Sequence, residues 1–178
     1  MGHKSSKRRG NIWNDAIHLN ELIVDFPFAT TGGKEKDFER GIATSLMVSK
    51  KSFKNPVITQ IDKSTSVESV YCFGKHHRPD MAIGKDGISI ELKFITYSGL
   101  KDAIGQAYLY RIQYKFVFLV LVINESRKDM YLDIAQGKEM PLNEVLESLA
   151  SQHNIFTYIV PSFLIKKPGI NKCISFFK

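Results

Sequence analysis

The stretch "RPDMAIGKDGISIELKF", residues 78–94, carries the strongest fold signal in the chain. Its second and third residues are Pro79 and Asp80, and the glycine-flanked segment "GKDG", residues 84–87, follows after three apolar residues. Residues 88–94 then alternate between apolar and polar side chains, which is typical of a β-strand with two different faces. The stretch therefore predicts a tight β-hairpin.

The second strand of this hairpin separates two sets of side chains. The apolar set is Ile88, Ile90, Leu92 and Phe94, and the polar set is Ser89, Glu91 and Lys93. Because successive side chains of a strand point to opposite faces, we expect the apolar set to face the core. The polar set then occupies the face on which chemistry can take place.

The turn decides whether Asp80 joins this polar face. A turn centred on residues 85–86 places Asp80 opposite Glu91, and one centred on 86–87 places it opposite Lys93. In both registers the three charged side chains share a face. A three-residue loop would instead turn Asp80 to the apolar face, because a slip of one residue inverts every side chain.

The remaining periodicity predicts an α/β fold with a central mixed β-sheet flanked by α-helices. The run "FVFLVLVI" is rich in strand-forming residues and is expected to be buried on both faces, in the middle of the sheet. We expect helices at residues 14–26, 34–51, 98–114 and 141–152, with Asn14 as a helix cap, and further strands at 66–73, 116–123, 129–134 and 155–160.

Length and composition predict one domain, residues 13–178, behind a basic flexible arm, residues 1–12. The 178 residues are 43% hydrophobic and include 12 Phe, which is enough for one core. The formal net charge of +7 favours an anionic partner, most commonly nucleic acid. Two cysteines, no secretory apolar run and no apolar run long enough to cross a bilayer predict an intracellular protein without a membrane segment.

Asp80, Glu91 and Lys93 together suit one chemistry in particular. Carboxylate oxygens from neighbouring strands can hold Mg²⁺ or Mn²⁺, which takes its remaining ligands from water and substrate phosphate. The neighbouring lysine can orient a water molecule or stabilise negative charge at the phosphorus. The three side chains therefore indicate phosphodiester hydrolysis.

Pro79-Asp80, followed on the next strand by Glu91, Leu92 and Lys93, resembles the motif of the PD-(D/E)XK nuclease superfamily, which has the restriction-endonuclease-like fold. The resemblance implies that Asp80 and Glu91 bind a metal ion together with the main-chain carbonyl of Leu92. It also implies that Lys93 positions or activates the attacking water.

The resemblance extends over residues 36–123 to both neighbouring helices. Glu39 matches the helix glutamate that precedes the hairpin in this superfamily and would hold the metal directly or through water, although Glu35 lies one helical turn earlier and could serve instead. Gln106 and Tyr110 match a pair found in RecB-like members and would contact the metal-bound water or the DNA backbone. Their spacing of four places both on one helix face.

These residues predict a Mg²⁺-dependent deoxyribonuclease of repair, recombination or restriction, whose substrate is a duplex site, a branched junction or a free end. A homodimer or a larger complex would be compatible with the small size. The alternatives are a non-catalytic DNA-binding module of the same fold and, less favoured because no phosphate-binding glycine loop is present, a nucleotide hydrolase. The side chains expected to bind DNA phosphates are Lys7, Arg8, Arg9, Lys75, His77, Arg78, Lys101 and Arg111.

Overall fold

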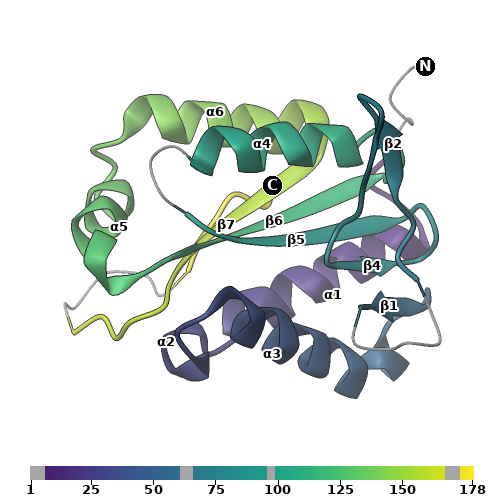
Figure 1. Cartoon of the computed structure of the whole chain (residues 1–178), viewed down its shortest axis with the longest axis horizontal. Coiled ribbons are helices and arrows are strands. Elements are labelled where there is room, and N and C mark those ends of the chain that lie inside the picture. The colour runs from purple at the N-terminus through teal and green to yellow at the C-terminus, as the bar shows by residue number, and fades with distance from the viewer. Residues whose placement is uncertain (1–6, 61–65, 96–98, 167–172) are drawn as a thin grey trace.

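The computed structural model describes residues 7–60, 66–95, 99–166 and 173–178. A six-stranded mixed sheet lies between two layers of helices (Figure 1). This arrangement confirms the predicted α/β class with a central mixed sheet flanked by helices.

The strand order of the sheet is β1-β4-β5-β6-β7-β8. β4 pairs antiparallel with both β1 and β5, the central β5, β6 and β7 run parallel to one another, and β8 is antiparallel to β7. The strands are β1 (Val57–Thr59), β4 (Met81–Ile83), β5 (Ile88–Phe94), β6 (Phe116–Ile123), β7 (Ile155–Pro161) and β8 (Ile174–Ser175).

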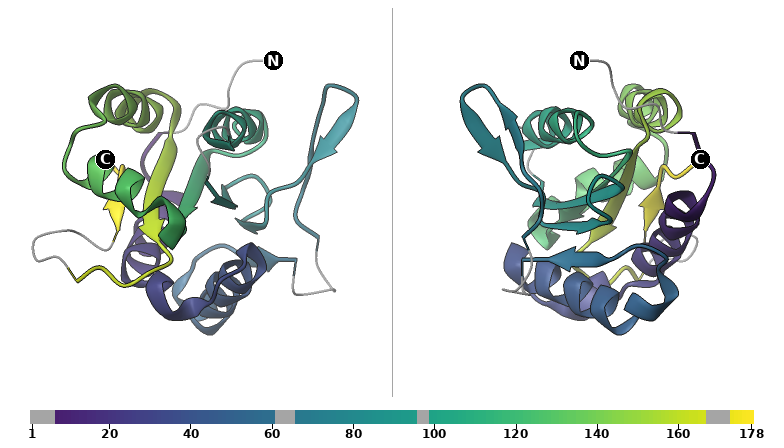
Figure 2. Two further views of the ribbon diagram at one scale, coloured as in Figure 1. Left: turned by 60° about the vertical axis from the view of Figure 1, so that its left-hand side comes forward. Right: turned by 90° about the vertical axis from the view of Figure 1, so that its right-hand side faces the viewer.

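Each face of the sheet is covered by its own helices (Figures 1 and 2). The first face packs against α1 (Asn11–Asp25), α2 (Phe28–Thr31) and α3 (Glu35–Val48). The second packs against α4 (Gly99–Tyr110), α5 (Lys128–Ala135) and α6 (Met140–His153). Two short 3₁₀ turns, η1 (Lys50–Ser52) and η2 (Glu125–Arg127), complete the helical segments described. None of the helices in the described ranges is long and apolar enough to cross a lipid bilayer.

The two cores explain why the central strands are apolar throughout. All eight residues of β6 are buried, and they alternate between the core under α1 and α3 and the core under α4 and α6. This is the pattern expected of a parallel strand covered on both sides. β5 differs because its second face carries Ser89 and Glu91, which are nevertheless buried. The polar face of β5 is therefore covered by protein along most of its length.

A separate two-stranded hairpin, β2 (Val70–Cys72) and β3 (Lys75–His77), projects from the body of the molecule (Figure 2). Its base belongs to the second core, where Val67 and Val70 are buried. The Tyr114 hydroxyl donates a hydrogen bond to the main-chain oxygen of Glu68 over 2.7 Å. Of the predicted strand 66–73, only residues 70–72 form a strand, and it pairs outside the main sheet.

Several predicted elements differ from the observed ones. The strand expected at 129–134 is the helix α5, whose buried residues Met130, Tyr131 and Ile134 follow helical spacing. The helix expected from Asn14 begins at Asn11 and has no side-chain cap. The helix expected at 98–114 is observed from Gly99 to Tyr110, and Ser98 lies outside the described residues.

Part of the segment predicted as a flexible basic arm, residues 1–12, lies in the described structure. Residues 1–6 lie outside the described ranges, and residues 11 and 12 already belong to α1. Arg8 is held against the body, since its guanidinium donates hydrogen bonds to Asn154 Oδ1 (2.9 Å) and to the main-chain oxygens of Ala150 and Lys178. It also lies 5.6 Å from the ring centroid of Trp13. Arg8 therefore fastens the segment just before α1 to α6 and to Lys178.

Candidate active site

The β4–β5 hairpin brings Asp80 and Glu91 together. Ile83 pairs with Ile88 and Met81 with Ile90, so Asp80, one residue before β4, stands opposite Glu91. This is the register of a turn centred on residues 85–86, the first of the two that were predicted. The main-chain N–H of Leu92 donates a hydrogen bond to Asp80 Oδ2 over 2.8 Å, which fixes the carboxylate beside β5.

Gly87 gives the turn its close contact with the rest of the fold. A Cβ atom at this position would lie 2.2 Å from Ile12 Cδ1 and 2.4 Å from the main-chain oxygen of Ile83. The Gly87 carbonyl accepts hydrogen bonds from the N–H groups of Lys115 and Phe116, at the start of β6. Glycine is therefore required here so that the turn can pack against α1 and β6.

Glu91 lies at the centre of a hydrogen-bonded chain. Only 1% of its surface is exposed, yet both carboxylate oxygens have partners. Lys93 Nζ lies 2.9 Å from Oε1, and the Tyr110 hydroxyl donates to Oε2 over 3.0 Å. The same hydroxyl accepts a hydrogen bond from Gln106 Nε2 at 2.7 Å. The predicted pair on α4 thus reaches the site through one face of the helix, and Tyr110 contacts Glu91 directly.

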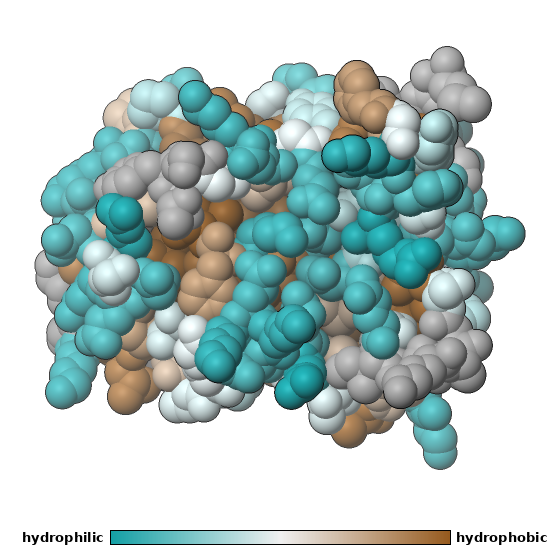
Figure 3. All heavy atoms as spheres, in the orientation of Figure 1, coloured by the Kyte–Doolittle hydropathy of each residue, from teal (hydrophilic) through white to brown (hydrophobic). Residues whose placement is uncertain are grey.

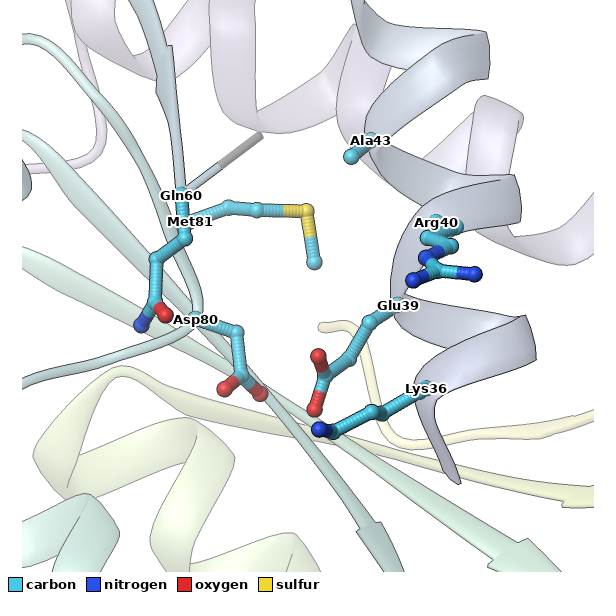
Figure 4. A pocket seen from close by; sticks show the side chains of 7 residues that line it. All are labelled: Lys36, Glu39, Arg40, Ala43, Gln60, Asp80 and Met81. Atoms are coloured by element: carbon cyan, nitrogen blue, oxygen red, sulfur yellow. The ribbon is translucent and has the colours of Figure 1, made fainter. Parts of the chain in front are cut away.

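Helix α3 supplies two further carboxylates, one helical turn apart. Glu35 Oε2 accepts a hydrogen bond from the main-chain N–H of Phe94 (2.9 Å), and Glu35 Oε1 lies 3.9 Å from Lys93 Nζ. Glu39 instead faces Asp80, and Figure 4 shows the two carboxylates pointing toward one another. The two glutamates therefore have different places, with Glu35 beside Lys93 and Glu39 beside Asp80.

The start of α3 explains how these glutamates reach the sheet. The main-chain N–H of Lys34 donates to Asp37 Oδ2 over 3.1 Å, which closes the first turn of the helix. Acidic residues in this turn, Glu35 among them, also interact favourably with the positive end of the helix dipole. Phe38 and Ile42 follow Glu35 at helical spacing on the same side of α3, and they are fully buried and hold the helix against the sheet.

An open cleft of about 340 Å³ lies between α3 and the end of β4 (Figure 4). Hydrophilic side chains gather over α3 and the neighbouring strand ends on this face of the molecule (Figure 3). The cleft is lined by Lys36, Glu39, Arg40, Ala43, Gln60, Asp80 and Met81.

Three polar lining residues, Lys36, Arg40 and Gln60, were not predicted from the sequence. The first two lie one helical turn apart on α3, beside Glu39, so helical spacing was a usable signal for them. Gln60 follows the short strand β1, which sequence periodicity did not reveal. Its Nε2 donates to the main-chain oxygen of Pro79 over 3.3 Å and so contacts the segment that carries Asp80.

Burial and mutual repulsion disfavour the charged forms of the Asp80 and Glu91 carboxyl groups. Burial, followed by the negative charge of Glu91, raises the pKa of Asp80 to about 7. Burial also raises the pKa of Glu91, even though Lys93 and Tyr110 both stabilise its charged form. A cation placed between the two carboxylates would relieve this repulsion.

Lys93 keeps its charge in these surroundings. Burial alone would lower the pKa of its ammonium group, but the neighbouring Glu91 and Asp80 more than offset that effect and the pKa is raised. The pKa of Tyr110 is also raised, by burial and then by the negative charge of Glu91. At neutral pH both side chains therefore act as hydrogen-bond donors toward Glu91.

The basic residues predicted to bind DNA fall into two groups. Lys7, Arg9, Lys75, Arg78 and Lys101 are exposed, and His77 is half-buried, with Nε2 3.3 Å from the main-chain oxygen of Cys72. Arg111 is only 4% exposed, and its guanidinium donates to the main-chain oxygens of His153 and Tyr114. The guanidinium groups of Arg111 and Arg8 therefore hold segments of this chain together.

The donor types around the cleft suit a hard cation. Asp80, Glu91 and Glu39 offer carboxylate oxygens from two strands and one helix, which is the ligand type preferred by Mg²⁺ and Mn²⁺. Among the described residues, no three acidic, histidine or cysteine side chains already stand grouped around one point as metal ligands. The fit of a hard cation to this site therefore depends on the carboxylate type of the donors and on the closeness of their negative charges.

Comparison of the chain with protein-family models, with curated proteins and with solved structures gave no match.

Proposed function

We propose that this chain is a metal-dependent nuclease of the PD-(D/E)XK type, which hydrolyses phosphodiester bonds of DNA. The observation that supports this most is the β4–β5 hairpin, which sets Asp80 opposite Glu91 and holds Lys93 Nζ 2.9 Å from the Glu91 carboxylate. Two desolvated carboxylates and one ammonium group, at the edge of an open cleft, are poorly explained by stability alone. Burying such charges usually costs more than their attraction returns.

The metal would be Mg²⁺ or Mn²⁺, held by Asp80, Glu91 and the main-chain oxygen of Leu92, with Glu39 as a direct or water-mediated ligand. When bound, such an ion acts as a Lewis acid and lowers the pKa of a coordinated water. The raised pKa of Asp80 supports this assignment, because a cation would stabilise the charged carboxylates that burial and repulsion disfavour. Glu39 is preferred to Glu35 because its carboxylate faces Asp80 (Figure 4).

Lys93 would act as a charged donor. Its raised pKa keeps the ammonium group protonated at neutral pH, so it can orient a water molecule or stabilise negative charge on the phosphate. It is unsuited to remove a proton in this state. Tyr110 and Gln106 position Glu91 from the side of α4, and Glu35 holds the strand at Phe94.

The substrate would be bound through its phosphates. Lys36 and Arg40 line the cleft beside the carboxylates, and Lys75 and Arg78 are exposed on the segment that leads to Asp80. Because the chain has a formal net charge of +7, its affinity for DNA should fall steeply as the salt concentration is raised. A DNA substrate implies an intracellular location, and a homodimer would supply two such sites, one for each strand of a duplex.

One observation favours a second candidate, a non-catalytic DNA-binding module. Both oxygens of Glu91 already have partners within the chain, so the cluster could serve to hold α4 against β5. In that case DNA would bind equally well with and without divalent metal. This dependence on metal separates the two functions.

The test is a titration with Mn²⁺, monitored by electron paramagnetic resonance, on the parent protein, Asp80→Asn and Glu91→Gln. Glu144→Gln is the matched control, because Glu144 is an exposed carboxylate on α6. The nuclease proposal expects one site that each strand variant weakens at least tenfold and the control leaves unchanged. Equal Mn²⁺ affinity in all four proteins, together with unchanged DNA binding in chelator, would support the binding module instead.

A further inference from the structure

The β2–β3 hairpin ends in a two-residue tip that places an aromatic ring in solvent. Cys72 pairs with Lys75, so the tip consists of Phe73 and Gly74. Both have positive φ, 52° and 75°, which is the signature of a type I′ turn. Figure 3 shows apolar surface at the corner of the molecule where this hairpin projects in Figure 1.

Phenylalanine is sterically unfavourable at the first position of a type I′ turn. Asn, Asp or Gly adopts positive φ with less steric conflict, and these residues dominate type I′ turns. Phe73 is 88% exposed, so its ring gains almost nothing from burial inside the chain. Tyr71, on the preceding strand, is 66% exposed. Neither turn preference nor core packing accounts for the Phe73 ring.

The hairpin is nevertheless firmly attached to the body. Val67 and Val70 are buried against the α4 side of the molecule, and Tyr114 donates its hydroxyl to Glu68. Within the hairpin, the rings of Tyr71 and His76 lie 5.0 Å apart, and Ser69 Oγ lies 3.0 Å from His76 Nδ1. The tip is therefore held on an ordered support and is suited to contact a partner.

The position of the hairpin connects this partner to the active site. β3 leads through Arg78 into Pro79 and Asp80, and Phe73 and Asp80 are seven positions apart along the chain. A fully extended segment of that length spans at most about 25 Å. Lys75 and Arg78 on the same segment are exposed and positively charged. A ligand that lies on the carboxylates is thus within reach of the tip.

We propose that the β2–β3 hairpin is a stacking arm, which places Phe73 against an unpaired base of the DNA strand that enters the active site. This inference rests on the proposed nuclease function and narrows its substrate to DNA with single-stranded or branched segments. An exposed ring flanked by cations is the combination that binds single strands, since every base offers a face for stacking and every nucleotide a phosphate. In an intact duplex the base faces are already covered by their neighbours.

The test measures DNA binding in chelator, so that it does not depend on cleavage. The variant is Phe73→Asn, which removes the ring but suits a type I′ turn, so folding is expected to be unchanged or improved. Its unfolding midpoint is measured alongside. Met140→Ala is the control, because Met140 is exposed (64%) on α6, outside the hairpin and the cleft.

For a single-stranded oligonucleotide and a flapped duplex we expect Phe73→Asn to bind about tenfold more weakly than the parent, within the range measured for loss of one base-stacking aromatic. Binding to the intact duplex should change less than twofold. A 2-aminopurine base in the flap should show quenching with the parent and little with the variant. Equal affinity of parent and variant for all three DNAs would overturn the stacking arm, as would a loss confined to the intact duplex.

The outcomes for the arm and for the nuclease can be told apart. A selective loss of single-strand binding in Phe73→Asn establishes the arm even if the parent cleaves no DNA. Conversely, metal-dependent cleavage by a parent whose DNA binding does not depend on Phe73 leaves the nuclease in place and removes the arm.

Discussion

Removing the hydroxyl of Tyr110 isolates the buried hydrogen bond that joins α4 to the carboxylate of Glu91. Tyr110 is fully buried, and its hydroxyl lies 2.7 Å from Gln106 Nε2 and 3.0 Å from Glu91 Oε2. Tyr110→Phe keeps the ring and its packing. The variant therefore changes only the two hydrogen bonds of the hydroxyl group.

The loss of stability in Tyr110→Phe depends on whether Glu91 is charged. A hydrogen bond to a charged group contributes about 1.5–3 kcal/mol to stability, whereas a bond between neutral groups contributes about 0.5–1.5 kcal/mol. Gln106 is only half-buried, so its amide can turn toward water in the variant. The lost hydrogen bond between Gln106 and the hydroxyl therefore adds little to the loss of stability. For a hydrogen bond to a charged Glu91 carboxylate we expect a loss of about 2 kcal/mol at pH 8. Because the pKa of Glu91 is raised, the loss should be smaller at pH 5 than at pH 8.

The assay is urea unfolding at pH 8 and pH 5, in chelator. With a urea dependence of about 2 kcal/mol/M, a loss of 2 kcal/mol lowers the midpoint by about 1 M. Tyr108→Phe is the control, because Tyr108 lies on the same helix and its hydroxyl bonds to none of the described residues. If Tyr110→Phe is as stable as Tyr108→Phe at pH 8, the reasoning about a charged, hydrogen-bonded Glu91 is refuted.

Three further predictions concern titration and the choice of metal ligand. In chelator Asp80 should lower the stability of the parent as pH rises from about 4 to about 7, because folded Asp80 keeps its proton up to a pKa of about 7 whereas the unfolded chain releases it near 4. The raised pKa of Glu91 adds to the slope in both proteins, so in urea unfolding Asp80→Asn should show a shallower slope than the parent, and an equal slope would contradict the prediction. Calorimetric titration with Mn²⁺ should show about tenfold weaker binding for Glu39→Gln and less than twofold change for Glu35→Gln, and the reverse order would exchange their roles. Burial raises the pKa of the Cys173 thiol to about 12, so iodoacetamide at pH 8 should label Cys72 alone, and rapid labelling of both would be inconsistent with that burial.

The central strands and the hairpin could be predicted because their signals are local. The alternation in residues 88–94 and the turn at 84–87 involve neighbours in the chain, and they favoured two registers, with Asp80 opposite Glu91 or opposite Lys93. The structure has the first of these. The apolar run at 116–123 likewise left little choice but a strand covered on both faces.

Other features depend on partners far along the chain. β1 and β8 have three residues or fewer, and they are strands only because β4 and β7 offer an edge to pair with. In residues 129–134 the apolar side chains fit a strand as well as a helix, and packing of Met130, Tyr131 and Ile134 in the second core decides for the helix.

The site residues likewise divide into those predicted from local signals and those decided by contacts far along the chain. Glu35 and Glu39 share one helix face, so spacing alone could not choose between them; their places follow from how α3 crosses the sheet. Arg111 looked like a phosphate-binding residue because it is charged, but its carbonyl partner in His153 is 42 residues away. The burial of charged side chains is decided by such distant contacts.

The most direct test of the proposed nuclease is cleavage of a DNA panel with Mg²⁺, with Mn²⁺ and with chelator. The panel comprises supercoiled plasmid, linear duplex, single strand, flap and four-way junction, and the proteins are the parent, Lys93→Ala and the control Lys128→Ala, which alters an exposed lysine of α5. We expect cleavage by the parent and by the control only with metal, and at least a hundredfold loss in Lys93→Ala. Cleavage that persists in chelator or in Lys93→Ala, or DNA binding without any cleavage by the parent, would contradict the proposal.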